Sequence, residues 1–103
     1  MKKILLVCDL GMSTSLMVKK MQEAAKNREL NVEICAKSVR DYKSCAAEFD
    51  VALLGPQIRY KLPECEKIAI EHGKKIACID MMAYGTMKGD KVLDQALALI
   101  EGV

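Results

Sequence analysis

Residues 8–15 read Cys-Asp-Leu-Gly-Met-Ser-Thr-Ser and place a thiol beside a glycine and three hydroxyl side chains. A short, mostly apolar run, Lys3 to Val7, precedes them, and an amphipathic pattern covers residues 16–28. This order predicts a buried strand, a loop and a helix. Backbone N–H groups at a helix start bind oxyanions and favour the thiolate form of a nearby cysteine. A thiolate can attack phosphorus, so we expect Cys8 to carry a phosphoryl group on sulfur.

Length and composition indicate a single domain, residues 1–103, with a full apolar core. Apolar residues make up 51% of the chain, and 16 basic and 14 acidic residues give a net charge of +2. Because the charges are well mixed, we expect no nucleic-acid partner. The chain shows neither a signal peptide nor an apolar run near the ~20 residues that span a bilayer. We therefore expect a cytoplasmic protein without direct membrane insertion.

The cysteines do not form a metal or disulfide pattern. There are five, an odd number, without a C-x-x-C pair, and there is one histidine, His72. We expect no metal site and no cofactor, and we place His72 on the inner face of a helix near its end. The remaining cysteines are expected in the core or on neutral surface: Cys35, Cys45, Cys65 and Cys78.

Short apolar segments alternate with amphipathic ones along the rest of the chain. Strands are predicted at Val32–Ala36, Val51–Leu54 and Ile76–Ile79. Helices are predicted from Ser38, with Asp41 completing a capping box, from Pro63 and from Gly89, whereas residues 80–87 read as a loop or short turn. Four alternations predict an α/β fold, a doubly wound parallel sheet with helices on both faces.

In such a sheet the loops that follow the strands gather at one edge, where ligands bind. That edge should collect Cys8 and its loop, Gly55 to Arg59, and Asp80 to Gly85. We expect Gln57 and Arg59 to contact a partner or phosphoryl oxygens, although Arg59 also fits an ordinary solvated arginine. Tyr84 either shares this role or packs under the loop.

A close catalytic comparison is the C-x5-R-[ST] loop of low-molecular-weight tyrosine phosphatases, which also follows a first strand. Counted from Cys8, Thr14 stands at the arginine position and Ser15 follows. Hydrolysis needs the arginine and a general acid, for which Asp80 is the only candidate. The pattern therefore favours phosphoryl transfer, with a phosphatase-like protein acting on phosphoesters as the alternative. A thiol redox protein lacks its resolving cysteine, and a receiver domain would not end its third strand in Leu54-Gly55.

The motif resembles the phosphocysteine loop of lactose/cellobiose (chitobiose)-type enzyme IIB, a component of the bacterial phosphoenolpyruvate-dependent sugar phosphotransferase system. The resemblance spans the whole chain. It rests on Cys8-x-x-Gly11-Met12-Ser13-Thr14-Ser15 after a KKILLV strand, on residues 53–60 (LLGPQIRY), and on Tyr84-Gly85-x-Met87-x-Gly89.

This resemblance implies a four-stranded parallel sheet of order 2-1-3-4. It implies that Cys8 accepts a phosphoryl group from a phosphohistidine of enzyme IIA. Cys8 then passes it to a sugar, a β-linked disaccharide such as cellobiose, chitobiose or lactose, during import through the membrane component, enzyme IIC. The phosphate-binding loop carries over, mainly through backbone N–H groups, onto Asp9, Leu10, Gly11, Met12, Ser13, Thr14 and Ser15.

Asp9 departs from the small residue that often follows the cysteine in this family. A carboxylate beside a thiolate disfavours the thiolate and repels phosphate. We expect its side chain either to turn away from the sulfur or to cap a nearby N–H. Leu10 and Met12 form an apolar docking rim or lie buried under the loop.

Overall fold

The computed structural model describes residues 2–8 and 15–101, which form a sheet covered by helices. Two of the helical segments, η1 and η2, are short 3-10 helices. The elements, in chain order, are β1 (Lys2–Cys8), α1 (Ser15–Asn27), β2 (Val32–Ser38), α2 (Val39–Cys45), η1 (Ala46–Glu48), β3 (Val51–Leu54), η2 (Pro56–Lys61), α3 (Leu62–Glu71), β4 (Lys75–Cys78), α4 (Met81–Gly85) and α5 (Gly89–Glu101).

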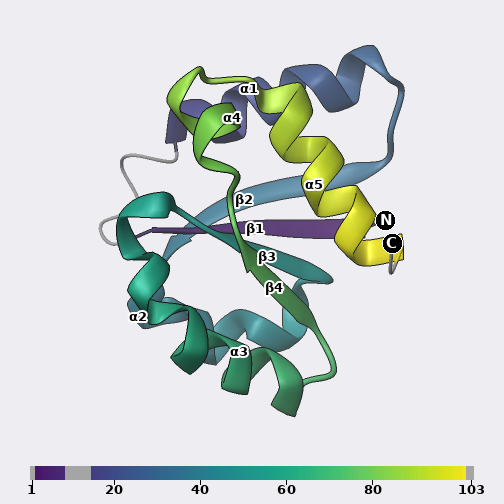
Figure 1. The fold of residues 1–103 in the computed structure, drawn as a ribbon. Coiled ribbons are helices and arrows are strands. Elements are labelled where there is room, and N and C mark those ends of the chain that lie inside the picture. The colour runs from purple at the N-terminus through teal and green to yellow at the C-terminus, as the bar shows by residue number, and fades with distance from the viewer. Residues whose placement is uncertain (1, 9–14, 102–103) are drawn as a thin grey trace.

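The four strands are parallel and lie in the order β2-β1-β3-β4, as expected. Helices α1 and α5 cover one face of the sheet and α2 and α3 the other (Figure 1). The chain adds β2 on one side of β1 and then crosses to add β3 on the other side. The strand order therefore reverses between β1 and β3, and this reversal is where open α/β sheets bind ligands.

Successive residues of β1 feed two separate cores, because side chains alternate across a strand. Ile4 and Leu6 pack with Met17, Met21 and residues of α5 on one face. Leu5 and Val7 pack with residues of α2 and α3 on the other. All four of these β1 side chains are fully buried, each worth about 1.5–3 kcal/mol of apolar burial. This two-sided burial is the reason that β1 reads as a continuous apolar run.

Three local details differ from the expectations. Residues 81–85 form a helix, α4, whose N-cap Asp80 accepts a hydrogen bond from the Ala83 N–H at 2.9 Å. His72 is exposed at the C-cap of α3 rather than on its inner face, because the helix ends one residue earlier. Ser38 is the N-cap of α2, but its hydroxyl donates to the Asp41 carboxylate instead of accepting from a backbone N–H.

Candidate functional site

Cys8 is the last residue of β1 and lies at the carboxyl edge of the sheet, beside the reversal of strand order. On one side it pairs in register with Ser38 of β2. On the other, the Gly55 N–H donates to the Val7 carbonyl at 2.8 Å, which brings the end of β3 alongside. The Cys8 side chain is 1% exposed. The thiol is thus held on a central strand, at the level where the neighbouring strands end.

The segment after β3 turns sharply at Gly55 and Pro56 and continues as η2. A β-carbon on Gly55 would lie 2.9 Å from Oε1 of Gln57, the end of an exposed side chain, and 3.6 Å from the Val7 carbonyl oxygen. Gln57 and Arg59 are both exposed. Two of the three segments predicted to gather do meet, because Gln57 Nε2 donates to the Tyr84 hydroxyl at 3.4 Å.

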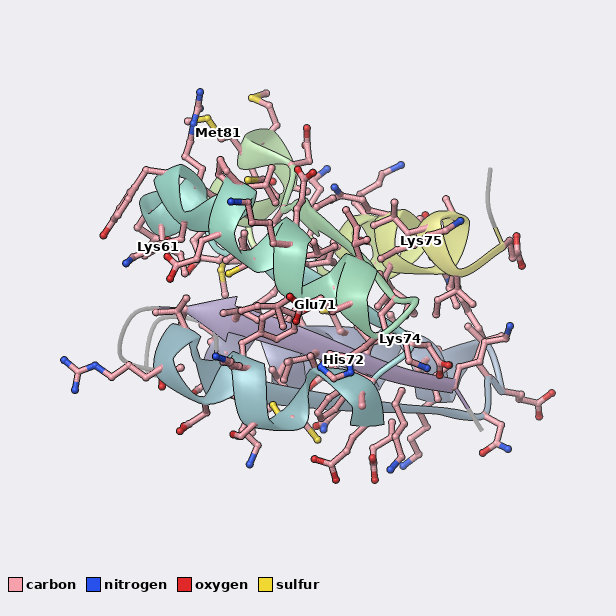
Figure 2. All side chains as sticks on the ribbon, turned by 90° about the horizontal axis from the view of Figure 1, so that it is seen from below. Lys61, Glu71, His72, Lys74, Lys75 and Met81 are labelled. Atoms are coloured by element: carbon pink, nitrogen blue, oxygen red, sulfur yellow. The ribbon has the colours of Figure 1, made fainter. Side chains whose placement is uncertain are left out.

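A second contact joins the same two segments. Arg59 Nη1 lies 3.8 Å from Sδ of Met81, the first residue of α4. Between η2 and α4 lies a depression of about 330 Å³ whose lining includes Arg59, Cys78 and Met81. Lys61 and Met81 lie at the end of the molecule toward which β1 runs, with Lys75 toward the other end (Figure 2). This end of the sheet therefore presents cations beside exposed apolar side chains.

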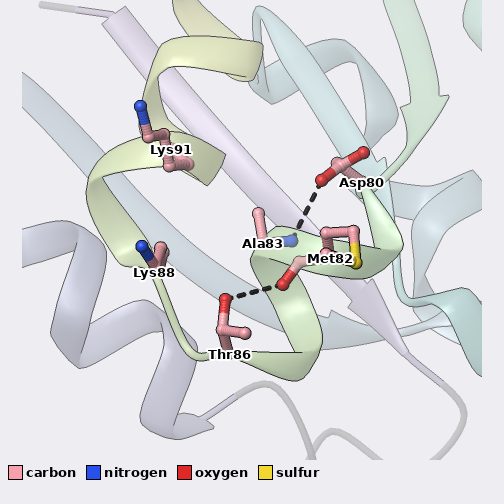
Figure 3. Close-up of a pocket in the computed structure, with 6 residues that line it drawn as sticks. All are labelled: Asp80, Met82, Ala83, Thr86, Lys88 and Lys91. Carbon is pink, nitrogen blue, oxygen red and sulfur yellow. Dashed lines mark hydrogen bonds between the residues drawn. The ribbon is translucent and has the colours of Figure 1, made fainter.

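Helix α4 holds Tyr84 at the site, and Asp80 starts that helix. Figure 3 shows the Asp80 carboxylate bonded to the Ala83 N–H, beside a cavity of about 310 Å³ between α4 and the beginning of α5. Lys88 and Lys91 also line this cavity. Because the carboxylate of Asp80 is engaged as a helix cap, nothing observed here favours Asp80 as the general acid of a phosphatase.

Three other cysteines are poor candidates for nucleophiles. Burial raises the pKa of the thiols of Cys45 and Cys65. Burial also raises the pKa of Cys78, an effect that the nearby Arg59 partly offsets. A raised pKa keeps these groups as thiols at neutral pH, and the thiolate is the reactive form. Within residues 2–8 and 15–101, no cluster of three or more His, Cys, Asp or Glu side chains could hold a metal ion.

Among the predicted site residues, Gln57 and Tyr84 are in contact, and Arg59 contacts Met81 of the same helix as Tyr84. Cys8 ends β1 at the same sheet edge, beside the end of β3. Ser15 is exposed and begins α1. The other predicted loop residues, Asp9, Leu10, Gly11, Met12, Ser13 and Thr14, lie outside the described residues.

Two neighbours of the site were not expected from the sequence. Ser38 pairs with Cys8 only through the register of β1 and β2. Gln95 of α5 bonds the backbone at the end of β4, with Nε2 2.7 Å from the Cys78 carbonyl. A polar residue on the inward side of an amphipathic helix was the signal available for Gln95.

None of the helices in the described part of the chain has the length and apolar character that crossing a membrane requires.

Comparisons with known proteins identify a family. Residues 3–95 match the family model of the lactose/cellobiose-specific IIB subunit of the PTS system. The oligo-beta-mannoside-specific EIIB component of Bacillus subtilis is 43% identical over 100 residues, covering 97% of each chain. The cellobiose-specific EIIB component of Lactococcus lactis is 45% identical over 100 residues, covering 92% of this chain and 93% of the other.

Two solved structures share the fold. The cellobiose-specific phosphotransferase IIB component of Borrelia burgdorferi has a TM-score of 0.82 at 38% identity, over 98% of this chain and 93% of that one. The lactose-specific IIB domain of Streptococcus pneumoniae has a TM-score of 0.86 at 21% identity, over 95% and 96% of the two chains. The chain therefore belongs to the family of lactose/cellobiose-specific IIB subunits, which are phosphotransferase components.

Proposed function

We propose that residues 1–103 act as one IIB domain that carries a phosphoryl group on Cys8. The thiolate attacks the phosphorus of a phosphohistidine on enzyme IIA, so that an S–P bond forms as the N–P bond breaks. A sugar hydroxyl then attacks the same phosphorus. The new O–P bond replaces the S–P bond, the thiolate is regenerated, and the hydroxyl proton leaves to a base at the sugar site.

One observation carries this proposal: the Cys8 thiol ends a central strand at the reversal of strand order. Phosphorylated ligands of doubly wound folds bind at that position. The residues that follow Cys8 in the chain supply a glycine and three hydroxyls for the phosphoryl oxygens. We assign the phosphate-binding role to Asp9 through Ser15, and a supporting or partner-contact role to Gln57, Arg59 and Tyr84.

The chemistry favours transfer over hydrolysis. Thr14 stands where the phosphatase loop has its arginine, so stabilisation of a hydrolytic transition state is reduced. A carrier benefits from this change, because attack by water would waste the phosphoryl group. Burial raises the pKa of Cys45, Cys65 and Cys78, so these three thiols are poor alternatives to Cys8 as the carrier.

The relatives' names suggest the acceptor. Three related EIIB components are named as specific for oligo-beta-mannosides, cellobiose and galactose. We propose a β-linked disaccharide as the sugar, phosphorylated in the cytoplasm as it enters through the membrane component, enzyme IIC. We place the sugar pocket on enzyme IIC, the component through which the sugar enters.

The test is phosphorylation of the purified chain. The protein is incubated with labelled phosphoenolpyruvate, the general phosphotransferase components and enzyme IIA. We expect one phosphoryl group per chain, released by iodine because iodine attacks the S–P bond. Cys8→Ser should abolish the label, whereas Cys35→Ser, a half-buried cysteine on β2, should keep it.

Label that survives Cys8→Ser would contradict the carrier assignment. Absence of label in the unaltered protein would contradict it as well. Steady release of inorganic phosphate without a sugar acceptor would instead support the phosphatase alternative.

A further inference from the structure

The side chain of Gln95 makes two hydrogen bonds to the backbone where β4 ends. Its Nε2 donates to the Cys78 carbonyl at 2.7 Å, and its Oε1 accepts from the Asp80 N–H at 3.0 Å. One carboxamide therefore bonds the groups on both sides of Ile79. The Ile79 N–H itself points to the other side and donates to the Leu54 carbonyl of β3 at 2.8 Å.

This arrangement reproduces the bonding of a parallel strand. In a parallel ladder, one residue of the neighbouring strand donates to the carbonyl before its partner and accepts from the N–H after it. Since β4 is the edge strand, no fifth strand is paired with it in the described sheet. Gln95 supplies the two bonds that such a strand would make, and so it satisfies backbone groups that an edge leaves open.

The bonded backbone leads directly into α4. Asp80 is the N-cap of α4, and Tyr84 lies four residues further on. Tyr84 accepts a hydrogen bond from Gln57, and Met81 lies against Arg59. The position of α4 relative to η2 therefore depends on where the chain leaves β4, which the Gln95 carboxamide fixes from α5.

We propose that Gln95 is a positioning residue for phosphoryl transfer: it holds the start of α4 so that Tyr84 and Gln57 meet beside the edge where Cys8 lies. This inference rests on the proposed function. Gln95 acts through Tyr84 and its effect is on engagement of the phosphorylated donor, because Gln57 and Arg59 are exposed at the surface that a donor reaches.

The experiment compares two glutamines that each bond the backbone at an edge of the sheet, one near α4 and one at the opposite edge. Gln22 of α1 donates through Nε2 to the Ile34 carbonyl at 3.2 Å, on the opposite edge strand β2. Gln95→Met removes two side-chain bonds to the backbone at one edge of the sheet, and Gln22→Met removes one at the other edge. Both substitutions change side-chain length and helix propensity little. Each variant is assayed with phosphorylated enzyme IIA for KM and kcat, and the Asp80 N–H is followed by hydrogen exchange.

We expect Gln95→Met to raise the KM for phosphorylated enzyme IIA about fivefold, because part of the free energy of the two lost hydrogen bonds reaches the donor surface through α4. The kcat should change less than about twofold, and exchange at the Asp80 N–H should accelerate. Gln22→Met should leave the KM within about twofold. In a Tyr84→Ala background, Gln95→Met should raise the KM further by less than about twofold. The reason is that Gln95 acts through Tyr84, whose side chain is already removed.

An unchanged KM in Gln95→Met, with a normally phosphorylated parent protein, overturns this inference and leaves the proposed function intact. An equal rise in the two glutamine variants overturns it too, because the effect would then be one of general stability. If the parent protein itself takes no phosphoryl group, the proposed function fails first.

Discussion

At the scale of single residues, Cys8 differs from the other cysteines in its position in the sheet. Cys8 and Cys78 both end a strand, but β1 is central and β4 is an edge. Cys45 and Cys65 lie in the core between the sheet and helices α2 and α3. The same burial that raises the pKa of these two thiols also acts on Tyr42, which is 1% exposed.

Tyr42 should make folding stability depend on pH in alkaline solution. Burial, with contributions from Cys65 and Cys45, raises its pKa from 10.0 to about 12. The folded protein therefore holds this proton more tightly than the unfolded chain. The resulting stabilisation is complete below pH 10 and is lost as the pH rises through 12. Between pH 10 and pH 12, the free energy of unfolding of Tyr42→Phe should therefore fall by about 2 kcal/mol less than that of the parent protein. Urea denaturation measures this difference.

A matched variant isolates this effect. Tyr60 is 70% exposed, so Tyr60→Phe removes a tyrosine hydroxyl outside the core and serves as the control. Phenolate absorbance gives a second measurement, since an ionisation near pH 12 should be missing in Tyr42→Phe. Parallel stability curves for the parent protein and Tyr42→Phe would contradict the assignment.

At the scale of elements, the close approach of α1 and α5 fixes the helical layer on one face of the sheet. Gly89 begins α5 and is buried against α1. A β-carbon there would lie 2.5 Å from the Lys20 carbonyl carbon and 2.7 Å from the Met21 nitrogen. Backbone atoms cannot move aside as a flexible side chain can, so any larger residue must separate the two helices.

Gly89→Ala should therefore destabilise the fold by about 1–3 kcal/mol, the usual cost of overpacking. Gly85→Ala is the matched control, because Gly85 ends α4 with nothing within 4 Å of its would-be β-carbon. It should be neutral or slightly stabilising, by at most about 1 kcal/mol. Thermal and urea denaturation of both variants measure the difference. Equal effects of the two substitutions would show that helix packing at Gly89 does not matter.

The elements also show how far sequence reasoning reaches. The strands were predictable because β1 and β3 are buried on both faces and so read as unbroken apolar runs. The meeting of η2 and α4 followed from topology alone. Helix α4 was not predicted, because five residues carry little periodicity and the Asp80 cap was the only start signal. Ser38 and Gln95 reach the site through strand register and a contact between elements, which local patterns do not encode.

At the scale of the whole molecule, one sheet joins two apolar cores, which share no side chain among residues 2–8 and 15–101. Leu5 faces the core under α2 and α3, and Leu6 faces the core under α1 and α5. Both are fully buried and adjacent in β1. Because the central strand contributes to both cores, a loss on either face weakens the strand that carries Cys8. The two layers should therefore unfold together.

Leu5→Ala and Leu6→Ala test this cooperativity. Each should lower the free energy of unfolding by about 2–5 kcal/mol, the range for truncating a buried leucine. Each should shift the whole urea transition to lower concentration with its slope unchanged, and far-UV and near-UV signals should coincide. Leu30→Ala, at a leucine that is 37% exposed, should cost less than about 1 kcal/mol. A transition that divides into two steps in either β1 variant would mean that the faces fold separately. In that case, a destabilising substitution in the core under α2 and α3 would leave the Cys8 edge and the α1–α5 layer folded.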